Sequence, residues 1–472
     1  MAEKKVRDKE DLAQKALFIA QQQGIDSIEI FVQSSDILQF AAGSAVRIAG
    51  RRFYEQGIAI RIIKNNRLGF VCGTTDEDLK KLIKSASLQV HAQIPEAGSY
   101  GKSFPPGKEI RQESPNLSDI ISIGREELET ITNEMMRSTE LDPLARTVES
   151  SATRHIEERL VANSEGLIRE SNDAWIVVGN QAIVRRATGE KGFGFNSILT
   201  RDVESFDPLS VGSRAYASAM ILSNALRASN REQDRLRRSR RILWHPNALA
   251  QLLAHILVPT IARISQVLPE TQQNSNNDKF SFPSMFDVLD DPTKQDLIPN
   301  YAFDDEGVST RKKTLISNGK LVSRLSDYSH SVQDSGGNSY RVQYFSERFR
   351  SFRYTPVLSP VNLLLDCTED IHPTNLVDLC SGATIMVQRV IGAHVASPTT
   401  GDFSVDVAEG YLARDHQIRF PIRKMSITGN IYHLLKAVRA VGITETVHPL
   451  PSPFAISCPF VLTEKSGSII FS

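Results

Sequence analysis

The spacing of apolar residues in the first hundred positions predicts a helix, several strands and a second helix. One helical stripe within residues 11–23 consists of Leu12, Ala16, Ile19 and Ala20, and Gly24 supplies a stop. Thr74 and Glu77 form a capping-box pattern that opens a helix to about residue 91. Apolar or alternating runs predict strands at 28–32, 46–54, 57–63 and 68–72, with a turn at 64–66.

The same patterns continue along the rest of the chain. A segment rich in Pro, Gly and Ser predicts a loop at 95–118. Helices are predicted at 119–138, 208–228, 246–264 and 431–441. Strands are predicted from 147 onward and at 174–178, 309–316, 320–325, 384–390, 403–413, 417–422, 454–461 and 468–471. Asn318-Gly319 between two of these strands is typical of a type I′ hairpin turn.

This order of elements predicts an α+β fold with two domains. Residues 1–229 would form an N-terminal α/β sandwich-like domain, and residues 230–472 a β-rich C-terminal domain. A chain of 472 residues, of which 40% are hydrophobic, is long enough for two cores. A basic run at 231–241 contains six Arg and marks the boundary. Because no aromatic residues interleave with these Arg, a linker or solvated helix end is favoured over a nucleic-acid patch.

Composition excludes several functional classes. Lys plus Arg and Asp plus Glu each number 55, so no global field would recruit nucleic acid or an anionic membrane. We find no run that approaches the roughly 18 apolar residues of a membrane helix, and no secretory core at the N-terminus. We therefore expect a cytoplasmic protein. Its four Cys show no CxxC spacing, which indicates reduced, structural thiols.

Four segments resemble, in the same order, the TldD/PmbA family of metallopeptidases, known as modulators of DNA gyrase. They are the hairpin Gly57–Ile63 with Arg67–Phe70, the turn Asn163–Gly166, the segment Asp304–Arg311, and a C-terminal signature that runs from Ser397–Ser404 through Pro421 to Asn430. Each segment alone is a weak signal, because Gly turns and alternating strands are common. Four of them in the family's order make a specific resemblance.

One motif of the catalytic members is missing. They carry HExxxH, in which two His hold zinc and the Glu activates the zinc-bound water. No His of this chain is followed by Glu, and the closest two in sequence, His245 and His255, are ten positions apart. The chain therefore resembles the PmbA/TldE-type subunit, which lacks HExxxH.

His255 lies in the region that resembles the metal-binding helix of the catalytic members. If His255 takes the first ligand position, Ile256 replaces the general base and Thr260 the second ligand. If it takes the Glu position, Ala254 and Pro259 replace both ligands. We expect a packed, hydrogen-bonded core histidine at this degenerate position, and no metal or other cofactor held by this chain.

Two segments are candidates for lining a cavity for substrate or partner: Asp304, Asp305, Glu306 and Gly307, and Gly401, Asp402, Phe403 and Ser404. Adjacent acids on a strand point in different directions and the EF-hand spacing is absent, so a turn or capping role is favoured for the three acids over a cation site. The second segment is not GxSxG, which disfavours Ser404 as a nucleophile. Cys458 lies in an apolar strand, unlike the glycine-rich setting of the family's Cys ligand, and we expect it to be buried.

The resemblance implies a function for the whole chain. It would be the non-catalytic subunit of a heterodimer with a TldD-type HExxxH subunit, which holds the zinc and hydrolyses unfolded peptides. This chain would supply half of a closed chamber and hold substrate as an extended strand along a sheet edge. Two alternatives remain: a stand-alone metallopeptidase with unrecognised ligands, and a non-proteolytic scaffold or regulator. Metal in the single chain would favour the first, and salt-dependent DNA binding the second.

Overall fold

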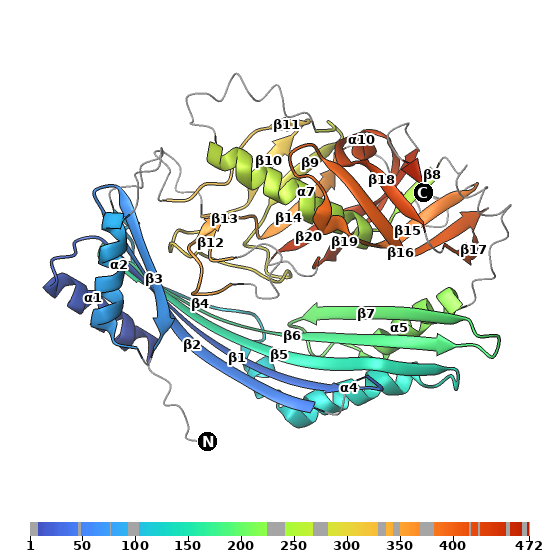
Figure 1. Ribbon diagram of the computed structural model, residues 1–472, viewed down its shortest axis with the longest axis horizontal. Coiled ribbons are helices and arrows are strands. Elements are labelled where there is room, and N and C mark those ends of the chain that lie inside the picture. Colours follow the sequence, from blue (N-terminus) through green and yellow to red (C-terminus); the bar gives the residue numbers. More distant parts are fainter. Residues whose placement is uncertain are drawn as a thin grey trace.

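The computed structural model describes residues 8–45, 49–75, 77–92, 103–223, 241–267, 282–328, 337–342, 350–368, 382–414, 417–422, 425–449, 454–464 and 470–471. Within them the chain forms two large sheets and several helices, which confirms the predicted α+β class (Figure 1). The expected domain boundary at 229/230 and nearly all of the basic run lie outside the described residues.

The first sheet contains seven strands in the order β3-β2-β1-β5-β6-β4, with β7 also paired to β6. The strands are β1 (Ile28–Ala42), β2 (Ala49–Lys64), β3 (Arg67–Thr74), β4 (Ile110–Glu113), β5 (Ala145–Asn163), β6 (Ile168–Arg185) and β7 (Lys191–Thr200). All pairs are antiparallel except β4 with β6. The sheet is curved, and the C-terminal half of the chain is seated on its concave side (Figure 1).

Helices cover the other face of this sheet. They are α1 (Lys9–Gln22), α2 (Leu79–Ala92), α3 (Leu117–Ser122), α4 (Arg125–Thr139) and α5 (Pro208–Ser223). The Asp8 carboxylate caps α1 by accepting the first backbone N–H groups of the helix. Gly192 and Gly194 let α5 lie directly on β7, because a Cβ at either position would come within 2.0 Å of an α5 carbonyl oxygen.

The second sheet contains twelve strands in the order β11-β10-β9-β14-β20-β8-β15-β16-β18-β21, with β17 paired to β16 and β19 to β20. The strands are β8 (Arg241–Trp244), β9 (Phe286–Asp290), β10 (Lys313–Ser317), β11 (Lys320–Leu321), β14 (Asn362–Cys367), β15 (Thr384–Ile391), β16 (Asp402–Arg414), β17 (Gln417–Pro421), β18 (Ser426–Asn430), β19 (Val438–Val447), β20 (Ala455–Glu464) and β21 (Ile470–Phe471). A separate short pair is formed by β12 (Ser339–Tyr340) and β13 (Val357–Leu358).

Helix α7 (Pro246–Val267) is the centre of the second core, together with α10 (Ile431–Lys436) and the 3-10 helix η3 (Ala393–Val395). The expectation that no run approaches a membrane helix is wrong by length and composition, since Pro246–Ser265 passes that test. However, 72% of this segment is buried inside the protein, where α7 packs on β15, β19 and β20. The burial is that of a core helix of a folded domain.

Several predicted elements are confirmed with shifted ends, and others are wrong. The Asn318-Gly319 turn is confirmed, with φ of 49° and 72° at its two central residues. The predicted helix at 119–138 is broken before Arg125, because the Glu127 carboxylate accepts the Gly124 N–H and starts a new helix there. The predicted helix at 431–441 ends at Lys436, and the chain continues as β19.

Candidate functional site

Residues 304–308 form a buried turn where the second half of the chain meets the first sheet. One carboxylate oxygen of Asp304 accepts the N–H groups of Glu306 (3.0 Å) and Val308 (2.9 Å), and the other accepts the Ser339 N–H (3.0 Å). Burial, and then the neighbouring Glu306, raise the pKa of Asp304 well above its usual range. Gly307 has a φ of 82°, a conformation that favours glycine. These hydrogen bonds make Asp304 the organising residue of the turn.

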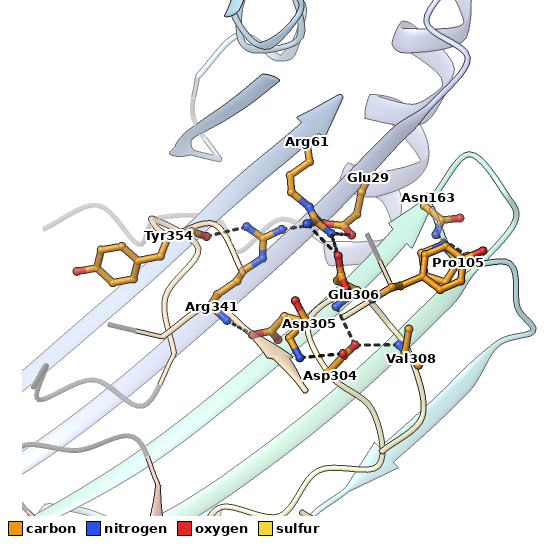
Figure 2. A network of polar contacts seen from close by, with 12 residues as sticks. Glu29, Arg61, Pro105, Asn163, Asp304, Asp305, Glu306, Val308, Arg341 and Tyr354 are labelled. Atoms are coloured by element: carbon orange, nitrogen blue, oxygen red, sulfur yellow. Dashed lines mark hydrogen bonds and ion pairs between the residues drawn. The ribbon is translucent and has the colours of Figure 1, made fainter. Parts of the chain in front are cut away.

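Glu306 joins this turn to the first sheet through a buried ionic network (Figure 2). Its carboxylate accepts hydrogen bonds from the Arg61 guanidinium (3.2 Å) and from the Tyr328 N–H (2.8 Å). Arg61 also donates to Glu29 through Nε (2.8 Å), and Arg341 donates to the same Glu29 carboxylate (2.7 Å). Burial alone would lower the pKa of Arg61, but Glu29 and Glu306 raise it above its usual range.

Asp305 extends the network on the other side of the turn. It accepts the Arg341 N–H at 2.6 Å, and the Arg350 Nε lies 3.3 Å from its carboxylate. The Arg350 guanidinium lies 3.5 Å from the centre of the Tyr301 ring, within cation–π distance. Asp304, Asp305 and Glu306 are all at most 2% exposed. The first candidate segment is therefore the centre of the contact between the two halves of the chain. Its carboxylates are buried and are not accessible to a peptide.

The second candidate segment forms an exposed turn that the signature residues hold together. Gly401 has a φ of 83°, and a Cβ there would lie 2.5 Å from the Tyr432 ring. The Asp402 carboxylate accepts hydrogen bonds from the Asn430 amide (2.8 Å) and the Thr400 hydroxyl (2.7 Å), which lower the pKa of Asp402. Phe403 is buried and Ser404 is exposed. Gly401, Asp402 and Asn430 therefore shape one turn before β16, which accounts physically for the signature.

His255 lies on α7 close to this turn. Its ring faces that of His394 of η3, with 6.4 Å between the ring centres. Burial, and then His394, lower the pKa of His255 to about 4, so its ring is neutral at neutral pH. The Thr260 hydroxyl, one turn along α7, lies 2.6 Å from the Pro398 carbonyl oxygen. The structure thus brings His255 near the Gly401–Ser404 segment, whereas the described contacts of the Asp304 turn involve none of these residues.

The residues around His255 do not fit the zinc site of the catalytic members. If His255 takes the first ligand position, the Ile256 side chain at the general-base position has no donor or acceptor atom. The Thr260 hydroxyl, at the second ligand position, lies within hydrogen-bond distance of the Ile256 carbonyl oxygen (2.7 Å) and of the Pro398 carbonyl oxygen. Within the described part of the chain, no group of three or more His, Cys, Asp or Glu has an arrangement that could hold a metal ion. The donor set therefore does not match a hydrolytic zinc centre.

The cysteines were expected to be reduced and structural. Cys72 and Cys458 are free thiols, Cys367 is half-buried on β14, and Cys380 lies outside the described residues. Cys458 is fully buried beside the Pro246 carbonyl (3.6 Å), and burial raises the pKa of its thiol. A neutral buried thiol is a poor metal ligand.

Sequence reasoning missed the partners in the ionic network. Glu29 lies between Ile28 and Ile30, and Arg61 lies between Ile60 and Ile62. A single charge inside an apolar strand run indicates a buried ion pair, because burying an unpaired charge is costly. That signal was present in both strands, and it could have identified this pair before the structure.

Sequence comparisons agree with the fold. Residues 29–89 match the model of PmbA/TldA metallopeptidase domain 1, and residues 238–467 match that of the PmbA/TldA metallopeptidase C-terminal domain. An uncharacterized protein of Methanocaldococcus jannaschii is 24% identical over 450 residues, which cover 94% of this chain and 98% of that protein. A metalloprotease of Synechocystis is 27% identical over 146 residues, which cover 30% of this chain and 29% of that protein.

Solved structures share the fold over nearly the whole chain. TldE from Thermococcus kodakarensis has a TM-score of 0.75 at 20% identity, and the match covers 98% of this chain and 99% of that one. A proposed modulator of a DNA gyrase from Thermotoga maritima has a TM-score of 0.75 at 18% identity, covering 98% and 100%. The two matching family models together span more than half of the sequence. The chain belongs to the PmbA/TldD family of metallopeptidases.

Proposed function

We propose that this chain is a non-catalytic subunit of a zinc metallopeptidase that acts on unfolded peptides. Its partner is a TldD-type homologue that carries HExxxH and holds the zinc. The observation that carries this proposal is that the donors of HExxxH are missing around His255 in either register: Ile256 and Thr260 replace them in one, and Ala254 and Pro259 in the other. A chain that keeps the family's fold but lacks the catalytic donors is suited to form one wall of its partner's active site and the interface with that partner.

The expected assembly is permanent and works in the cytoplasm. Permanent assemblies commonly bury more than roughly 2,000 Å² in total, so a stable complex should form at micromolar concentrations. The balanced charge of the chain gives no reason to include nucleic acid or a membrane among its partners.

The test mixes two separately purified subunits, this chain and an HExxxH-bearing homologue. The complex is sized by sedimentation, zinc is measured in each subunit, and cleavage of unfolded casein is followed with and without chelator. The isolated chain should contain no stoichiometric zinc and cleave nothing, whereas the mixture should cleave. A homologue in which Gln replaces the motif's Glu is the matched control and should assemble without activity.

Three results would contradict the proposal. Chelator-sensitive cleavage by the isolated chain would support the stand-alone peptidase. A homologue that cleaves equally well alone would remove the need for this subunit. Failure to form a complex at micromolar concentrations would rule out an obligate assembly.

A further inference from the structure

One face of the first sheet is covered by α1 to α5, and the described residues of the second half of the chain cover its opposite face mainly at one end. There the Gln33 side chain donates to the Arg350 carbonyl (3.2 Å), and the Phe352 ring lies directly over Gly57, 2.1 Å from where a Cβ would be. Farther along the strands, the side chains of this second face are largely half-buried or exposed. We call this uncovered part the open face.

Strand register places apolar side chains in two neighbouring rows of the open face. The first row runs across four strands, Phe53, Ile37, His155 and Trp175, and of these Trp175 is buried. In the second row, Val177 of β6 lies opposite Leu199 of β7. Because side chains alternate along a strand, these residues project to the side away from the helices.

Phe193 and Phe195 continue the open face along β7. Their neighbours Gly192 and Gly194 contact α5, so the two rings project to the opposite side. The Phe195 ring lies 3.6 Å from the Cβ position of Gly179, which has no side chain to fill the space beneath the ring. Phe193, Phe195 and Phe53 are 50%, 40% and 45% exposed, which is high for aromatic side chains within a sheet.

The middle of the open face is uncharged, but charged side chains flank it: Glu149 lies opposite Gln181, and Arg51 lies opposite Gln39. Between the exposed Phe residues lie Thr153, Val177, Gly179 and Gln181. His155 stacks on Trp175, with 5.2 Å between ring centres and an angle of 5° between the planes. Burial lowers the pKa of His155 to about 4, so its ring adds no charge at neutral pH. Because the flanking charges are of both signs, this surface favours neither an acidic nor a basic ligand.

The exposed aromatic area is small compared with a stable protein interface. At these exposures the three Phe residues present roughly 300 Å², taking about 200 Å² for a whole aromatic side chain. A stable protein interface needs about 800 Å² from each partner. From Phe195 to Phe53 the distance is four strand spacings across and six residues along, or about 28 Å, which an extended segment of about eight residues spans.

We infer that the open face, from Phe193 and Phe195 on β7 to Phe53 on β2, binds an extended peptide segment of about eight residues rich in aromatic and aliphatic side chains. The inference rests on the proposed function in taking that segment as the peptidase substrate. Contacts are made by side chains with the sheet face, so the segment's sequence matters less than its apolar content.

The test uses the isolated full chain and a fluorescein-labelled, capped octapeptide in which two Phe and two Leu alternate with Thr. Anisotropy titrations should give an affinity at least tenfold weaker for Phe193→Ser/Phe195→Ser than for the wild type. Phe18→Ser is the matched control: Phe18 is 60% exposed on α1, on the helix-covered side, and its loss should change nothing. An octapeptide with Ser in place of Phe and Leu should bind at least tenfold more weakly.

Photo-crosslinking provides a measurement that does not depend on any variant folding well. Benzoylphenylalanine in the octapeptide should crosslink to residues 175–199 of the wild-type chain. Crosslinks concentrated on β3, or unchanged affinity in the double variant, would overturn the inference. So would substitutions that weaken subunit association while peptide affinity stays the same, because the face would then be an interface.

The binding surface and the proposed subunit role can be refuted independently of each other. Peptide binding at the open face, without a complex between this chain and an HExxxH homologue, would refute only the subunit role. An active complex whose peptide affinity is unaffected by the β7 substitutions would refute only the open face as the binding surface.

Discussion

Glu29 of β1 lies directly opposite Arg61 of β2, and the same Glu29 carboxylate binds Arg341, a residue 312 positions away in sequence. All three side chains are buried, with exposures of 0%, 3% and 0%. One carboxylate thus bridges two cations from different halves of the molecule. Arg61 has Glu306 as a second anion, whereas Arg341 relies on Glu29 for its side-chain ion pair within the described residues.

We predict that Glu29→Gln destabilises the whole chain. Removing one member of a buried pair costs about 3 to 5 kcal/mol, because the remaining charge stays buried without compensation. Urea unfolding monitored by fluorescence measures the change. Glu464→Gln is the control, since its pair with Arg439 is exposed and should contribute less than about 1 kcal/mol. Equal effects of the two substitutions would show that the network does not hold the halves together.

His255→Ala should reduce stability more than activity. His255 lies on α7 among buried apolar side chains and packs against His394, so truncation should cost about 1 to 3 kcal/mol. Thermal melting of the variant and casein cleavage by the mixed subunits measure the two effects. His433→Ala, at an exposed position of α10, is the control. Wild-type melting with complete loss of activity would assign His255 a functional role.

Glu157 should make the protein less stable as the pH rises. Burial raises the pKa of this carboxyl from 4.5 to about 7, and Arg159, 4.0 Å away, only partly opposes the shift. A raised pKa means that the folded state prefers the protonated acid. The stabilising contribution of protonated Glu157 to the free energy of unfolding is therefore complete below pH 4.5, and it is lost as the pH rises through about 7.

Glu157→Gln should remove this part of the pH dependence. Between pH 4.5 and 8 the free energy of unfolding of the wild type should fall by roughly 3 kcal/mol more than that of the variant. Urea unfolding at several pH values measures the difference, with the exposed Glu165→Gln as control. Parallel curves for wild type and Glu157→Gln would mean that the pKa of Glu157 is the same in the folded and the unfolded protein.

Asp402→Lys should lower activity in the mixed complex by at least tenfold without removing zinc from the partner. The substitution removes the acceptor for Asn430 and Thr400 and reverses the charge of an exposed turn. Asp402→Asn retains a side-chain oxygen for Asn430 and should keep most of the activity. Casein cleavage and zinc content are measured together. Full activity of the Lys variant would exclude the turn from the shared cavity, and lost zinc would place it in the partner's metal site.

Local patterns predicted the elements whose sequence signal lies within a few residues. The stripe on α1 and the Asn318-Gly319 turn are of this kind, because helical spacing and turn-forming residues can be recognised without knowing the tertiary contacts. β1 was predicted to end at residue 32 but continues to Ala42. Its outer half has mixed polarity, and it is held by hydrogen bonds to β2 and β5 on both sides rather than by apolar alternation.

The candidate site was harder to predict because its partners are distant in sequence. Asp304, Asp305 and Glu306 were identified, but the cations that bind them include Arg61, which lies more than 200 positions away. β19 was predicted partly as a helix, since Val438–Val441 has no strong strand signal and pairing with β20 decides its conformation. Tertiary pairing overrides local preference in both cases.

The position of β1 in the middle of the first sheet has a consequence for synthesis of the chain. β2 pairs with one edge of β1 soon after both have left the ribosome, but the other edge waits for β5, which is complete only at Asn163. The gap from Lys64 to Asn163 is about 100 residues, so at 5 to 20 residues per second this edge is open for roughly 5 to 20 s. An unpaired strand edge is a template for aggregation. Nascent chains, and fragments that end before Asn163, should therefore depend on chaperones more than the finished protein does.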